Sequence, residues 1–66
     1  MKITVNGEVK EFGDDVTIEK IIELLEIKVG VMAAAVNMEI VKKDDWGSLK
    51  LKQDDKLELL QFVGGG

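Results

Sequence analysis

The sequence predicts a small α+β fold in which one main helix packs across one face of a mixed β-sheet. Polar and apolar residues alternate near both ends of the chain, an apolar stripe of helical period lies between them, and turn-forming residues separate the segments. A chain of 66 residues is long enough for one domain with a single small core. We therefore expect one domain over residues 1–63 and a flexible glycine tail at residues 64–66.

The first segment is predicted to form a β-hairpin. Residues 2–6 alternate in polarity and are rich in β-branched side chains, which favour a half-buried strand. Asn6-Gly7 is a strong turn signal, because both positions of a type I′ turn need positive φ. The return strand is expected over residues 8–12 with Val9 and Phe12 facing the core. Their spacing of three requires a bulge between them.

The next segment is predicted to be the helix. Thr17 is a typical N-cap residue, and Val16 and Ile21 are spaced for a hydrophobic staple around it. An apolar stripe of helical period follows, widened by Leu24. The members of the stripe are Ile18, Ile21, Ile22 and Leu25. Gly30 is expected to end the helix in a left-handed conformation.

The second half of the chain is expected to supply the remaining strands. Residues 31–36 form an apolar run with three alanines, which predicts a central strand. Asn37-Met38 is read as a turn into a short strand at residues 39–41. Residues 43–47 have no periodicity and are expected to form a turn or a single 3₁₀ turn. Trp46 within them is expected to cap one end of the core rather than to serve as a ligand platform.

The last strand is expected over residues 56–63. Side chains alternate between the two faces of a strand, so Leu60 and Phe62 share the outer face with Glu58, and the leucines that flank Glu58 point into the core. Two large apolar side chains on the outer surface of a sheet indicate a contact patch. We therefore predict that Glu58, Leu60 and Phe62 form a docking patch for a partner protein.

The composition excludes several kinds of function. The chain has no Cys, His or Arg, and 9 lysines against 13 acids give a net charge of −4. These absences exclude a thiolate nucleophile, a Ser-His-Asp triad and a zinc site with nitrogen or sulfur ligands. A cationic surface for nucleic acid is not expected, and no apolar run is long enough to span a membrane. We expect no catalytic residue, no metal site and a cytoplasmic location.

Three Asp-Asp pairs, at residues 14–15, 44–45 and 54–55, are the candidate cation ligands. Adjacent side chains diverge, and the spacing of a calcium-binding loop is not present. Each pair lies where a turn is needed, and Asp favours turns. We therefore expect all three pairs to be solvated turns.

The glycine tail, Gly64-Gly65-Gly66, has a structural and a functional interpretation. It is either a frayed end or an expression scar, or it is a segment that enters a narrow channel in a partner enzyme. Three extended glycines span about 10 Å and carry no Cβ atoms. The carboxylate of Gly66 would then be the reactive group. Attack on the α-phosphate of ATP converts such a carboxylate to an acyl-adenylate, from which a sulfur or nitrogen nucleophile displaces AMP.

The predicted order of elements is that of the β-grasp (ubiquitin-like) fold. Over essentially its whole length the sequence also resembles the ThiS-type sulfur carriers of thiamin biosynthesis. The resemblance rests on the chain length, the Asn6-Gly7 turn, residues 36–41, Trp46 and the ending at residues 62–66. The family often has Pro-Arg where this chain has Lys42-Lys43. This departure affects any partner contact made there, because Lys cannot reproduce a bidentate guanidinium contact.

The resemblance implies a function in which the chain is a carrier and not an enzyme. An ATP- and magnesium-dependent adenylyltransferase of the ThiF (E1-like) type would adenylate the Gly66 carboxylate, while Gly64 and Gly65 occupy its channel. A persulfide sulfur from a donor enzyme would convert the adenylate to a thiocarboxylate, and thiazole synthase would use that sulfur. The chain itself would bind no cofactor.

Two alternatives remain at this point. One is the other bacterial sulfur carrier, the small subunit of molybdopterin synthase, whose chains tend to be longer and to carry prolines shortly before the final glycines. This chain has no proline. The other is a β-grasp module that only binds a partner protein and whose glycines have no chemical role.

Overall fold

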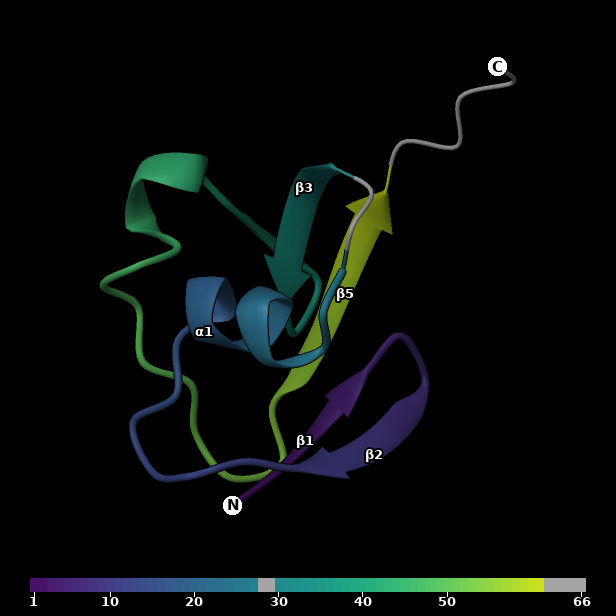
Figure 1. Cartoon of the computed structure of the whole chain (residues 1–66), viewed down its shortest axis with the longest axis vertical. Helices are drawn as coiled ribbons and strands as arrows, with labels where there is room; N and C mark the ends of the chain where they lie inside the picture. The colour runs from purple at the N-terminus through teal and green to yellow at the C-terminus, as the bar shows by residue number, and fades with distance from the viewer. Residues whose placement is uncertain (28–29, 62–66) are drawn as a thin grey trace.

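The computed structural model describes residues 1–27 and 30–61, which form one α-helix and a five-stranded sheet (Figure 1). The strands are β1 (Lys2–Val5), β2 (Glu8–Glu11), β3 (Val31–Val36), β4 (Glu39–Val41) and β5 (Lys56–Gln61). The helix is α1 (Ile18–Leu24), and η1 (Lys43–Asp45) is a single 3₁₀ turn. The predicted α+β class, with one main helix and a mixed sheet, is confirmed.

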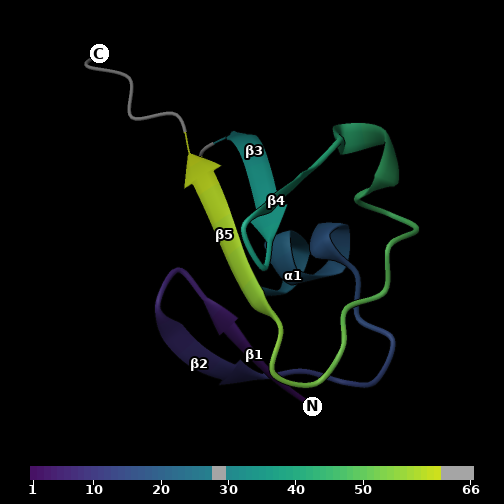
Figure 2. The same ribbon diagram turned by 180° about the vertical axis from the view of Figure 1, so that it is seen from behind.

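The sheet has the strand order β2-β1-β5-β3-β4, so the last strand in sequence occupies the centre. β5 is parallel to β1 and antiparallel to β3. Helix α1 lies against one face of the sheet, and Figure 2 views the molecule from the other side. No other helix in the described part of the chain covers that second face, which we call the outer face.

The first hairpin has the predicted turn but not the predicted register. Asn6 and Gly7 have φ values of 48° and 86°, as a type I′ turn requires. The pairing of β1 with β2 is regular, without a bulge, and Val9 lies opposite Thr4 with 66% of its surface exposed. The predicted inward Val9 and the bulge are therefore wrong. Strict alternation already places Phe12 on the core side, where it pairs with Met1 through two 2.8 Å bonds.

The helix begins as predicted. The Thr17 hydroxyl accepts a hydrogen bond from the backbone N–H of Lys20 at 3.2 Å, which satisfies a free donor of the first turn. Val16 and Ile21 are both buried, as the hydrophobic staple requires. Leu24 is 52% exposed, so its predicted place in the core stripe is wrong.

The helix ends earlier than predicted, and not at Gly30. Glu26 adopts a left-handed conformation with φ of 52°, and its N–H donates to the carbonyl of Glu23 at 3.1 Å. The N–H of Ile27 donates to the carbonyl of Ile22 at 3.3 Å. These two bonds define a Schellman motif, in which Glu26 takes the position that glycine usually occupies. Gly30 takes no part in this helix end, so the prediction that it ends the helix is wrong.

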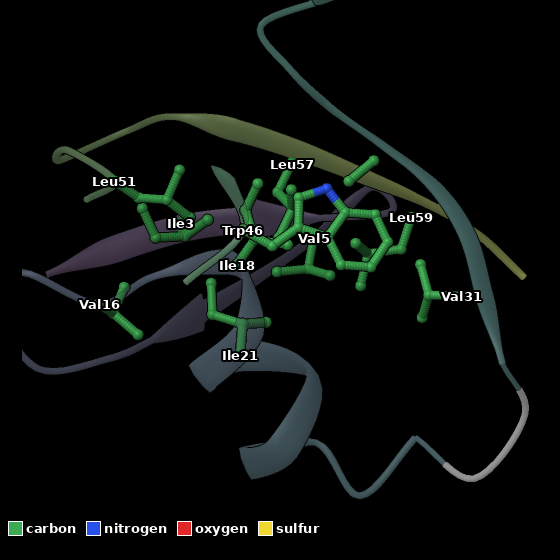
Figure 3. Close-up of a cluster of buried hydrophobic side chains, with 11 residues drawn as sticks. Ile3, Val5, Val16, Ile18, Ile21, Val31, Trp46, Leu51, Leu57 and Leu59 are labelled. Carbon is green, nitrogen blue, oxygen red and sulfur yellow. The ribbon is translucent and has the colours of Figure 1, made fainter. Parts of the chain in front are cut away.

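The core lies between α1 and the inner face of the sheet, and Trp46 is one of its buried side chains (Figure 3). Trp46 is 8% exposed, and its indole N–H donates to the carbonyl of Val41 at 2.9 Å. The prediction that Trp46 belongs to the core is confirmed. The other buried side chains are Ile3, Val5, Val16, Ile18, Ile21, Val31, Ala34, Leu51, Leu57 and Leu59.

The three Asp-Asp pairs lie in turns or in η1. Asp15 and Asp54 have positive φ, which Asp tolerates better than most residues. In residues 1–27 and 30–61, no group of three or more acidic, His or Cys side chains is placed to hold a metal ion.

Candidate functional site

The candidate site is the part of the outer face that is formed by β5 and its neighbours. Leu57 and Leu59 are buried, with 0% and 6% of their surface exposed, while Leu60 is 61% exposed and Glu58 is also exposed. The predicted alternation along β5 is therefore confirmed, and Glu58 and Leu60 share the outer face. Phe62 and the tail glycines Gly64, Gly65 and Gly66 lie outside the described residues.

Small side chains on β3 leave a shallow groove beside Leu60. Ala33 lies opposite Leu60 and Ala35 lies opposite Glu58 in the pairing of β3 with β5. Ile40 on β4 lies opposite Ala35 and is 75% exposed. A groove of about 240 Å³ lies among these side chains, and Asn6 also contributes to its lining. We call Ala33, Ala35, Ile40, Glu58 and Leu60 the outer-face groove.

The groove is wider than the predicted docking patch. Ile40, Ala33 and Ala35 were missed, because the sequence does not say that β3 and β4 lie beside β5 on the same face. Val41 packs on the core, and neighbouring side chains of a strand point to opposite faces. Ile40 therefore lies on the outer face, which becomes clear once β4 is known to pair with β3. Apolar side chains predominate in the groove, and Glu58 is its one charged member, so it suits an apolar partner surface with a cationic or donor group at its edge.

The register of β3 changes beside the end of β5. Val31 lies opposite Gln61 and Ala33 lies opposite Leu60, so two steps on β3 match one step on β5. Met32 is the extra residue, and 55% of its surface is exposed. An irregularity of this kind bends the strand and disrupts the ladder locally. Consequently, β3 holds Leu60 and Gln61 less regularly than it holds the rest of β5.

Two asparagine side chains fix β5 from the two hairpin turns. The Asn6 Oδ1 accepts from the N–H of Leu59 at 2.8 Å, and its Nδ2 lies 3.4 Å from the Leu59 carbonyl oxygen. The Asn37 Oδ1 accepts from the N–H of Lys56 at 3.0 Å, and its Nδ2 donates to Asp55 at 3.0 Å. Both asparagines have positive φ, so each forms a turn and also binds the central strand.

The model of the ThiS family matches residues 3–66 of the sequence. The chain belongs to the ThiS family. "Sulfur carrier protein ThiS" of Escherichia coli is 26% identical to it over 66 residues, which are the whole of both chains. ThiS from Geobacter metallireducens, described as a thiamine biosynthesis protein, has a crystal structure that matches the whole of both chains with a TM-score of 0.82 at 23% identity. This structural match confirms the β-grasp fold.

Two relatives of this ThiS-family chain are named "Thiazole synthase". The protein of Paramagnetospirillum magneticum is 35% identical over 66 residues, and that of Magnetococcus marinus is 32% identical. Both matches cover the whole chain but only 20% of the relative, so the chain spans about a fifth of the length of these proteins.

Among the helices that the structure describes here, none has the length and apolar character needed to cross a membrane.

Proposed function

We propose that this ThiS-family chain is a sulfur carrier for the thiazole of thiamin and that the carboxylate of Gly66 carries the sulfur. The observation that carries the proposal is the family match over residues 3–66, together with a sulfur carrier relative that is similar along its whole length. The residues support it as well, because Gly64-Gly65-Gly66 follows the central strand of the sheet after only two intervening residues.

The proposed chemistry starts with activation by a ThiF-type (E1-like) adenylyltransferase. A Gly66 carboxylate oxygen attacks the α-phosphate of ATP, which forms an acyl-adenylate and releases pyrophosphate. The persulfide of a donor enzyme then attacks the acyl carbon, and AMP leaves. This attack forms a carbon–sulfur bond. A second thiol of the donor then attacks the donor's inner sulfur and cleaves the original S–S bond of the persulfide, which leaves a thiocarboxylate on Gly66 and a disulfide on the donor.

The chain contributes presentation and docking to this sequence of steps. Gly64 and Gly65 have no Cβ atoms, so they suit a narrow channel in the adenylyltransferase. The outer-face groove supports docking, because Leu60 and Ile40 are exposed there and the small alanines leave room for an apolar side chain of the partner. We assign Phe62 to the same docking patch from its position in the sequence.

Thiazole synthase is the proposed acceptor of the sulfur. Two relatives of that name contain a region similar to this entire chain within a longer protein. Joining two proteins in one chain keeps their local concentration high, which is useful when one must deliver a group to the other. The relatives therefore support a direct contact between this carrier and a separate thiazole synthase.

No cofactor is assigned to the chain itself. We propose that ATP and magnesium are bound by the adenylyltransferase and that the carrier has no catalytic activity of its own. A carrier that is activated with ATP works where ATP is available, so we propose the cytoplasm as its compartment.

Intact-mass measurement tests the proposal. The chain is incubated with ATP, magnesium, a ThiF-type enzyme and a persulfide donor, and a mass gain equal to the replacement of one oxygen by sulfur is expected. A mixture without ATP is the control and should show no gain. An established ThiS carrier treated in parallel shows that the enzymes are active. If that carrier is converted and this chain is not, the proposal is wrong.

A further inference from the structure

The side chain of Asn6 extends the contact between β1 and β5 by one step beyond the backbone ladder. That ladder pairs Thr4 with Lys56 and Val5 with Leu57. The N–H of Asn6 still donates to the carbonyl of Leu57 at 2.9 Å, but the turn then carries the backbone away. The next bonds to β5 come from the side-chain amide of Asn6, which meets the N–H and carbonyl of Leu59. The primary amide thus replaces one peptide group of a parallel strand.

This contact is made just before the point at which β5 loses regular pairing with its other neighbour, β3. Leu59 is buried and precedes Leu60, which lies in the outer-face groove. On the β3 side, the irregularity at Met32 falls beside Leu60 and Gln61. On the side of β5 that faces β1, the Asn6 amide is therefore the main contact that holds the backbone near Leu59 and Leu60.

We propose that Asn6 is a positioning residue for sulfur loading, an inference that rests on the proposed function. By fixing Leu59, Asn6 sets the place of the last described residues of β5, which precede the tail in the sequence. A partner that grips the groove and receives the Gly66 carboxylate needs a defined spacing between the two. Small errors in the placement of a reacting group lower the rate of the chemical step more than they lower binding.

Asn37 provides a matched control within the same chain. It has the same turn conformation as Asn6, with φ of 51° against 48°, and it also binds β5 through its side-chain amide. Its contact is at Lys56, the first residue of β5, whereas the Asn6 contact is at Leu59, next to the groove. If the loss of any turn asparagine lowers kcat, the two variants should lower it by a similar amount. If kcat depends on the position of the end of β5, only the variant at Asn6 should lower it.

The test compares Asn6→Gly with Asn37→Gly. Glycine accepts positive φ, so each variant keeps its turn and loses only the amide. With the adenylyltransferase and persulfide donor, we expect Asn6→Gly to lower kcat for thiocarboxylate formation about tenfold, with KM for the carrier close to that of the parent chain. Asn37→Gly should leave both constants near their parent values. Asn6→Asp should restore most of kcat, because a carboxylate oxygen still accepts from the N–H of Leu59 and Asp tolerates positive φ.

The outcomes separate the two proposals. If the parent chain is converted and kcat of Asn6→Gly equals that of Asn37→Gly, Asn6 is only a turn residue and the positioning role is wrong. If the parent chain is not converted by active partners, the proposed function is wrong and the positioning role falls with it. Amide hydrogen exchange of the parent chain needs no variant. Slow exchange of the Leu59 N–H is expected, and exchange as fast as in a free peptide would overturn the inference.

Discussion

The indole N–H of Trp46 donates a 2.9 Å hydrogen bond to the carbonyl of Val41, the last residue of β4. The bond spans η1 and ties the turn that carries Trp46 to the edge of the sheet. It also explains how a large side chain with a polar group is 92% buried without an unsatisfied donor. Trp46 therefore stabilises the core by apolar burial and by fixing the end of β4, beside the outer-face groove.

Trp46→Phe should destabilise the fold without abolishing it. The substitution removes the bond to Val41 and leaves a small cavity, and we expect the free energy of unfolding to fall by about 1–3 kcal/mol. Urea unfolding followed by far-UV circular dichroism measures this, since the tryptophan signal is lost. Lys43→Ala is the control, because the Lys43 ammonium lies 5.7 Å from the ring centroid at an exposed position. Its effect should be below about 1 kcal/mol, and an equal loss in both variants would contradict the assignment.

Leu60→Glu should weaken binding of the ThiF-type adenylyltransferase with little loss of stability. Leu60 is 61% exposed in the groove, so a charge there disturbs an apolar interface but not the core. We expect Kd to rise at least about tenfold, the size of a moderate interface contact, by isothermal titration calorimetry. Leu24→Glu is the matched control, because Leu24 is 52% exposed on α1, away from the outer face. Equal weakening by both variants would place the docking surface elsewhere.

Deletion of Gly66 should abolish conversion to the thiocarboxylate and leave thermal stability unchanged. All of the buried core residues that the structure describes lie between Ile3 and Leu59, so the deletion removes no core contact among them. Intact-mass measurement with the full set of partners reports the conversion, and differential scanning calorimetry reports stability. A truncated chain that still gains sulfur would show that Gly66 is not the carrier residue.

The sequence was most informative where an apolar run or a regular alternation is bounded by clear turn residues. Residues 31–36 and 39–41 became β3 and β4 with the predicted bounds, and Leu57 and Leu59 face the core as alternation requires. The edge strand β2 was harder, because its inner face only partly meets the core, and Val9 was placed inward for its apolar side chain. Its regular pairing with β1 instead directs Val9 to the outer face.

The features of the candidate site that were missed depend on contacts between distant parts of the chain. The groove arises because β5 enters the sheet between β1 and β3, which brings Ile40 and Leu60 to one face. The bond from Asn6 to Leu59 joins residues 53 positions apart. Asn6-Gly7 predicted the turn correctly, but a local signal carries no information on what the amide of Asn6 binds.

The end of α1 provides a last prediction, because the glycine expected there is replaced by Glu26. An L-residue in the left-handed conformation costs about 1–2 kcal/mol, and Glu26 has φ of 52° at an exposed position. Glu26→Gly should remove most of this strain. It should also keep both hydrogen bonds of the Schellman motif, because these are made by the backbone N–H groups of residue 26 and Ile27. We expect the free energy of unfolding to rise by about 0.5–1 kcal/mol, measured by urea unfolding.

Glu26→Ala separates this effect from that of charge. Alanine removes the same negative charge from the C-terminal end of α1, where the helix dipole disfavours it, but it keeps the Cβ atom that makes the left-handed conformation costly. Only the glycine variant should therefore gain the full stabilisation. If alanine stabilises as much as glycine, the unfavourable charge and not the backbone conformation limits stability at this helix end, and the strain assigned to Glu26 is wrong.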